Sequence, residues 1–211
     1  MKQRLLLLIT VAFLFAACNN EKKEEVKTAK ADSTTKNEPY TMPDSATMMK
    51  AMMEYGTPGD IHKMMASWEG TWTGEITMWE KAGSAPTTST GTAVNKMVLN
   101  GLYQESIHTG NMMGMPFEGH STLAYDNAKK IFINTWIDNF GSGMMIMQGT
   151  WDAATKTMTL TGSSYNPALK RDCNYREVFK VIDDNTQLME MYGPAPDGSE
   201  WKMMEIKSTR K

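Results

Sequence analysis

Two histidines and a group of methionines are the residues of this sequence best suited to binding a metal. His108 and His120 lie on two segments joined by a hairpin that contains Met112, Met113 and Met115. Neighbouring strands can bring such side chains together, and imidazole with thioether sulfur suits Cu(I). The pattern therefore indicates a copper or haem site as one alternative. The other is an apolar loop beside ordinary strand histidines, because no CxxC, HExxH or His-x-His spacing occurs.

Catalytic motifs are absent from the sequence. It has no nucleophile elbow, no phosphate-binding glycine loop and no paired acids at a meaningful spacing. Glu177 and Glu190 could face a cavity from neighbouring strands, and a hydrolase or isomerase using such a cavity is a further alternative. Cys18 and Cys173 are far apart, which excludes a disulfide-dense scaffold. We therefore predict no enzyme and no cofactor.

The segments that must position these side chains have the period of two that is typical of β-strands. Turn-forming residues separate them, such as Asn100-Gly101 and Asp126-Asn127. The predicted strands are residues 69–80, 88–99, 102–110, 117–125, 130–138, 143–151, 157–165, 173–182, 186–192 and 200–209.

Helix signals occur only before these strands. Residues 45–55 begin with Ser45, which can cap a helix, and residues 58–68 place Pro58 in a first turn. Consecutive strands without intervening helices favour antiparallel pairing, and closure into a barrel removes exposed edges. We predict an all-β, up-and-down barrel of about ten antiparallel strands with one or two short N-terminal helices. Such a barrel is too wide for its side chains to fill, so it should contain a cavity.

Alternation along the strands predicts which side chains line this cavity. If Trp72 points inward, Ile76 and Met78 do so as well, and Met204 and Ile206 face inward on the last strand.

On the fifth strand, the set containing Trp136 and Asp138 combines aromatic and polar groups, as ligand sites often do. With His120, these two are the polar and aromatic cavity candidates. The alternative is that Trp136 is a core residue and Asp138 caps the turn at Asn139. The helix with His62 and the loop with Met112, Met113 and Met115 are expected to close one end together.

The composition fits an apolar ligand better than a charged polymer. The 211 residues include 21 methionines, and flexible methionines suit adaptable apolar surfaces. A formal net charge of −2 gives no electrostatic footprint for nucleic acid. We therefore expect a small apolar or amphipathic ligand.

The N-terminus resembles a bacterial lipoprotein signal. Lys2 and Arg4 precede an apolar stretch, and the small residues at 16 and 17 precede Cys18. We predict a signal peptide over residues 1–17, with Cys18 as the lipidated first residue of the mature protein. The alternative is a secretory signal in which Cys18 is incidental.

Residues 18–47 are polar and predicted to be a disordered tether, and residues 48–211 form the barrel domain. The charged residues 21–25 resemble surface-export signals of bacterial lipoproteins, with a plain charged linker as the alternative. We expect a lipid-anchored protein of the bacterial cell envelope, in the outer membrane.

Two resemblances extend this interpretation. Gly70, Trp72 and Arg210 resemble the Gly-x-Trp and C-terminal arginine of lipocalin-like (calycin) barrels. In those barrels the arginine packs on the tryptophan at the barrel floor, a cation–π contact.

Residues 54–211 also resemble the DUF1579 family of uncharacterised bacterial proteins. The motifs that carry this similarity include Glu54-Tyr55-Gly56-Thr57-Pro58-Gly59, Met112-Met113-Gly114-Met115-Pro116 and Thr135-Trp136-Ile137-Asp138-Asn139. The resemblance implies a lipocalin-like barrel and no established activity or catalytic residue.

Overall fold

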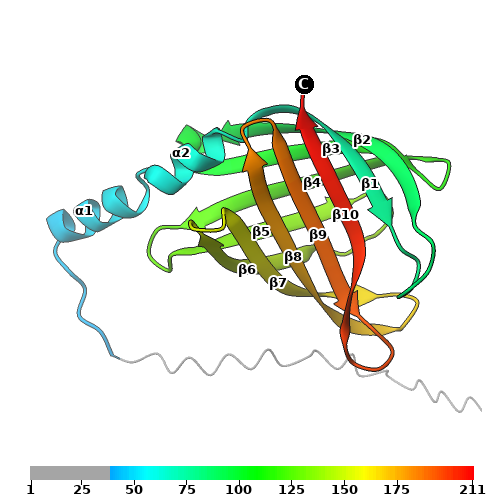
Figure 1. Ribbon diagram of the computed structural model, residues 1–211. Coiled ribbons are helices and arrows are strands. Elements are labelled where there is room, and N and C mark those ends of the chain that lie inside the picture. The colour runs from blue at the N-terminus through cyan, green and yellow to red at the C-terminus, as the bar shows by residue number, and fades with distance from the viewer. Residues whose placement is uncertain (1–38) are drawn as a thin grey trace, which may run out of the picture. The chain divides into compact units, whose positions relative to one another are not determined.

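The computed structural model describes residues 39–211, so the predicted signal peptide, Cys18 and most of the predicted tether lie outside the described residues. The unit from Pro43 to Lys211 contains two α-helices and ten strands (Figure 1). The helices are α1 (Ser45–Tyr55) and α2 (Asp60–Ala66), and a short 3-10 turn, η1 (Leu99–Gly101), follows the second strand. The strands are β1 (Gly70–Met78), β2 (Thr87–Val98), β3 (Tyr103–Met112), β4 (Met115–Asp126), β5 (Ile131–Asp138), β6 (Met145–Asp152), β7 (Thr157–Asn166), β8 (Arg171–Asp183), β9 (Thr186–Pro194) and β10 (Glu200–Arg210).

The ten strands form a closed antiparallel barrel. Each strand pairs with its neighbours in the chain, and β1 also pairs with β10, from Trp72 opposite Arg210 to Met78 opposite Met204. The predicted fold class, an up-and-down barrel of ten strands, is confirmed. Closure leaves no unpaired strand edge within this barrel.

Strand direction defines two ends of the barrel. We call the end with the start of β1 and the end of β10 the floor, and the opposite end the mouth. Figure 1 shows α2 beside the floor, near the end of β10. Because each strand reverses direction, the β3–β4 hairpin lies at the mouth.

One turn design recurs between strands. Asp126, Asp152 and Asn166 each accept hydrogen bonds through a side-chain oxygen from the backbone N–H groups two and three residues later. The lysine four residues after each adopts a positive φ of 52–58°. The first two copies are the similar turns visible in the sequence, and Asn166 adds a third. Such local bonds favour a tight reversal over continuation of the strand.

The helices differ slightly from the predicted ranges. α1 spans the predicted residues 45–55, but its N-cap is Asp44 instead of Ser45, with the Asp44 carboxylate accepting from Thr47 N at 2.9 Å. α1 therefore includes the last three residues of the predicted tether. α2 covers only part of the predicted range 58–68. Between residues 39 and 211, neither helix is long and apolar enough to cross a membrane.

Aromatic and sulfur-containing side chains fill the floor. Trp72 is 1% exposed, and its indole Nε1 donates to Trp68 O at 3.0 Å. Arg210 places its Cζ 4.2 Å from the centre of the Trp72 ring and donates to Ser67 O. This is the contact that the Gly-x-Trp and arginine pattern implies. Gly70 has φ 114°, and an added Cβ would lie 3.1 Å from Arg210 Nη1, so a side chain there would disturb the contact.

Candidate functional site

A cavity of about 480 Å³ lies inside the barrel, between the packed floor and the mouth. All ten strands contribute to its wall, together with Trp68 from the segment after α2. The wall is mainly apolar and contains sulfur from Met78, Met112, Met145, Met147, Met158, Met189, Met191, Met203 and Met204. The volume falls within the range of roughly 300–1,000 Å³ typical of small-molecule sites.

The structure places most of the predicted lining residues around this cavity. Ile76, Met78, Trp136, Asp138, Met204 and Ile206 all line it. They occupy alternate positions of β1, β5 and β10. The inward Trp72 and Arg210 predict the positions on β1 and β10, whereas the mixture of aromatic and polar groups predicts Trp136 and Asp138 on β5. Their contact with a ligand stays a prediction.

His120 does not belong to this wall. It pairs with Ile107 in the β3–β4 register, whereas His108 pairs with Gly119, so the two histidines face opposite sides of the barrel. His120 lies on the outer surface, with Nε2 2.9 Å from Glu118 Oε1. His108 lines the cavity, and burial together with the charge of His120 lowers the pKa of His108 to about 4.

The expected lid is divided between the two ends of the barrel. Met112 lines the cavity at the mouth, but Met113 is 84% exposed and Met115 49% exposed. His62 lies in α2 at the floor and is 2% exposed. Its Nδ1 accepts from Gly59 N at 3.0 Å, which caps α2. The prediction that His62 and this loop close one end together is therefore wrong.

These positions also separate the candidate metal ligands. The set of His108, His120, Met112, Met113 and Met115 is divided between the cavity and the outer surface. Within residues 39–211, no group of three or more His, Cys, Asp or Glu side chains is arranged to hold a metal ion. The five predicted ligands therefore do not meet at one coordinating site.

Trp136 anchors an aromatic group at the mouth end of the cavity. Its Nε1 donates to Asp138 Oδ2 at 2.8 Å, and Phe140 N donates to the other oxygen of Asp138 at 2.9 Å. The His108 and Trp136 rings meet edge to face at 5.1 Å. An added Cβ on Gly119 would lie 2.5 Å from the Trp136 ring, so the missing side chain makes room for the indole. Asp138 therefore both caps the turn and orients Trp136.

Asn134 and Glu177 also line the cavity, and their side-chain oxygens have no hydrogen-bond partner among residues 39–211. Asn134 Oδ1 is buried and accepts no hydrogen bond. Burial raises the pKa of Glu177 to about 7, and no hydrogen bond or neighbouring charge opposes this effect. Alternation with Trp136 indicates from the sequence that Asn134 faces inward. The isolation of Glu177 depends on neighbours in three strands, which the sequence pattern does not specify.

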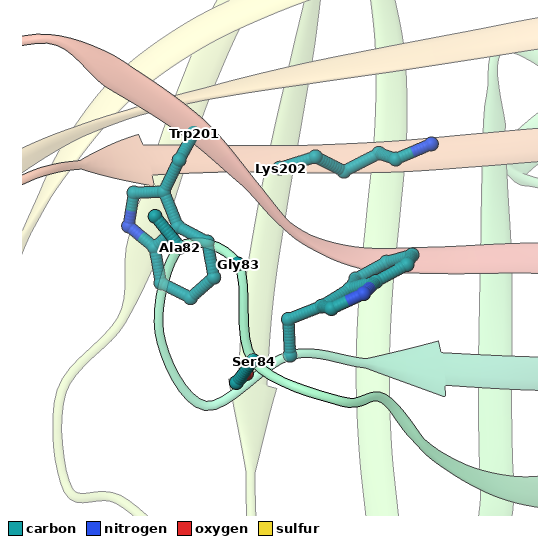
Figure 2. A pocket seen from close by; sticks show the side chains of 6 residues that line it. Ala82, Gly83, Ser84, Trp201 and Lys202 are labelled. Atoms are coloured by element: carbon teal, nitrogen blue, oxygen red, sulfur yellow. The ribbon is translucent and has the colours of Figure 1, made fainter.

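Glu190, the other carboxylate considered from the sequence, lies on the outer surface. Its Oε1 accepts from Lys202 Nζ at 2.8 Å. Near it, a smaller pocket of about 250 Å³ lies between the 79–84 segment and the start of β10 (Figure 2). Trp79, Trp201 and Lys202 are among its lining residues. Lys202 also bonds Glu205, so its charge is already paired.

Comparisons with known proteins agree with the fold. Residues 57–210 match a family described as "Protein of unknown function (DUF1579)". No curated protein sequence matches the chain. The crystal structure of Rv2717c from M. tuberculosis is similar, with a TM-score of 0.56 and 11% identity over 74% of this chain and 99% of that one. A redesigned β-barrel, b11L5F_LGL, aligns with 70% of this chain and 94% of its own at 13% identity and a TM-score of 0.35. At 11% identity, the similarity to Rv2717c bears on the fold alone.

Proposed function

The chain belongs to the DUF1579 family of proteins of unknown function, and from this premise we propose that its barrel binds a small apolar or amphipathic molecule in the internal cavity. The observation that carries the proposal is an unfilled, largely apolar space enclosed by ten paired strands. Well-packed proteins leave few voids of this size, and such space is typical of ligand sites.

The methionines support an adaptable site. Nine of the lining residues carry a thioether, and the methionine side chain adjusts its shape at low cost. Aromatic rings from Trp136, Tyr175 and Phe179 add flat apolar surface. This combination suits a range of apolar ligands of different shapes more than one ligand of fixed shape.

Filling the cavity tests the proposal. Ser121 lines it and pairs with Trp136, whereas the adjacent Thr122 faces outward. We expect Ser121→Phe to weaken binding of the fluorescent apolar probe N-phenyl-1-naphthylamine at least about tenfold, since the ring would occupy the space of the probe. Fluorescence titration of the purified protein measures the affinity.

Thr122→Phe is the matched control, because it adds the same ring on the other face of β4. Its affinity should equal that of the unchanged protein, and thermal unfolding should show both variants folded. Equal probe binding by folded Ser121→Phe and Thr122→Phe would place the probe outside the cavity and contradict the proposal.

We also propose that Cys18 carries the lipid anchor of an envelope protein. The support is the sequence alone, with a charged start, an apolar stretch and small residues before the cysteine. Cys18→Ala should abolish incorporation of labelled palmitate and release the protein from the membrane fraction. Cys173→Ala is the control, because this buried thiol lies in β8 and should leave labelling unchanged. Tight membrane association of Cys18→Ala would refute the anchor.

A further inference from the structure

The charged groups of the cavity wall have one sign. Among the described residues, the wall contains the carboxylates of Glu177 and Asp138 but no lysine or arginine. Asp138 is satisfied by Trp136 Nε1 and Phe140 N. The remaining carboxylate, Glu177, lines the cavity and accepts no hydrogen bond from the residues that the structure describes. Glu177 is half-buried in an apolar wall, and a desolvated carboxylate without a hydrogen-bond donor is costly, so a ligand that supplies the donor would lower this cost.

The side chains next to Glu177 in the barrel wall do not supply a hydrogen-bond donor to its carboxylate. In the strand register Glu177 lies between Leu160 of β7 and Met191 of β9. Tyr175 and Phe179, two positions away along β8, share its inward face and also line the cavity. The group is therefore surrounded by aliphatic, thioether and aromatic side chains, which explains its raised pKa.

The same surroundings suit a cation. Aromatic rings attract an ammonium group placed over their faces, and a desolvated site strengthens this attraction. The register continues from Met191 to Met204 and then to Met78, so a row of polarizable thioethers extends from the carboxylate. Asn134 Oδ1 also accepts no hydrogen bond within residues 39–211, but this atom is itself inaccessible, so Glu177 is the acceptor that a ligand can reach. A ligand that donates a hydrogen bond or carries a positive charge would therefore complement this wall.

We propose that the barrel selects cationic amphiphiles, and that Glu177, between Tyr175 and Phe179, pairs with the ammonium group of an apolar amine. This inference rests on the proposed binding function and adds the charge class of the ligand. An anionic lipid such as a fatty acid would instead bring its carboxylate into a wall that offers no lysine or arginine among the described residues.

The test compares three probes with the same chain and different head groups. Dodecylamine, dodecanol and dodecanoate, each below its micelle concentration, compete with bound N-phenyl-1-naphthylamine at pH 8. Dodecylamine should bind tightest, at least about tenfold more tightly than dodecanoate. Glu177→Gln should remove this preference while the affinity for dodecanol stays the same.

Glu75→Gln is the matched control, because Glu75 lies on β1 with an exposed side chain and lines no part of the cavity. It makes the same change of net charge and should retain the preference for the amine.

The pH dependence gives a second measurement. Dodecylamine stays protonated between pH 5.5 and 8, so its affinity should rise over this range as Glu177 ionises. The other titratable groups lining the cavity are His108, Asp138 and Tyr175. His108, with a pKa of about 4, stays neutral over this range. Glu177→Gln should abolish the rise.

The outcomes separate the two proposals. Equal affinities for dodecylamine and dodecanoate, or an amine preference that survives Glu177→Gln, would overturn this inference and leave the cavity function intact. If N-phenyl-1-naphthylamine does not bind at all, the proposed function itself fails.

Discussion

Trp72→Ala should lower the free energy of unfolding by about 3–5 kcal/mol, in the range measured for large aromatic residues removed from a core. The indole is 1% exposed and donates to Trp68 O. Its loss would leave that carbonyl without this donor and remove the ring on which Arg210 packs. Urea unfolding of the purified variant measures the change.

The loss of stability expected for Trp72→Ala is large because Trp72 positions Arg210, which connects separate segments of the floor. The guanidinium donates to Ser67 O, Glu69 O and Asp184 O, so it links the segment between α2 and β1 to the β8–β9 turn. The Trp72 ring holds the guanidinium in position for all three bonds. Trp79→Ala at the mouth is the control, because Trp79 is only half-buried and should lose much less stability. Equal losses for the two variants would contradict the role of Trp72 in closing the floor.

Glu177→Gln should make the protein more stable than the unchanged chain at pH 8, by roughly 3 kcal/mol. Burial raises the pKa of Glu177 from an ordinary value of 4.5 to about 7 in the folded protein. The contribution of protonated Glu177 to the free energy of unfolding is fully present below pH 4.5 and is lost as the pH rises through 7. Glutamine does not ionise, so the variant keeps this stability.

The advantage of Glu177→Gln should therefore shrink as pH falls from 8 toward 4.5. His108 has the opposite dependence, since its lowered pKa makes the protein lose stability as pH falls from 6.5 toward 4. Because His108 is present in both proteins, its contribution cancels in their difference. Urea unfolding at pH 5, 6, 7 and 8 provides the comparison, with Glu75→Gln expected to show no such trend. A variant less stable than the unchanged protein at pH 8 would mean that Glu177 has a partner.

The sequence predicts the barrel well because strands and turns are encoded locally. The ten segments of period two correspond to the ten strands, and Asp126 and Asp152 each bond the backbone two residues later in the turns that separate four of them. Gly70, Trp72 and Arg210 then fix which faces point inward at the two strands that close the barrel.

The sequence-based predictions fail where a shift of one residue in strand register decides the face of a side chain. They also fail where one strand reversal decides at which end of the barrel a residue lies. In the β3–β4 register, His120 lies opposite Ile107 and His108 lies opposite Gly119. Because adjacent residues of a strand point to opposite faces, the two histidines face opposite sides of the barrel wall. His62 is at the floor because α2 leads directly into the start of β1, whereas the loop with Met113 lies one strand length away. The environment of Glu177 requires neighbours from β7 and β9, and their offset depends on how the closed barrel is staggered.

The occupancy of the cavity is the most direct test of the account. The protein should be isolated from its own cells without denaturation and analysed by native mass spectrometry, with Ser121→Phe prepared in the same way. We predict a bound small molecule that organic extraction releases from the unchanged protein and that is absent from Ser121→Phe. The same bound mass on the filled variant, or an unchanged protein that carries no small molecule and binds no apolar probe, would contradict a ligand-binding barrel.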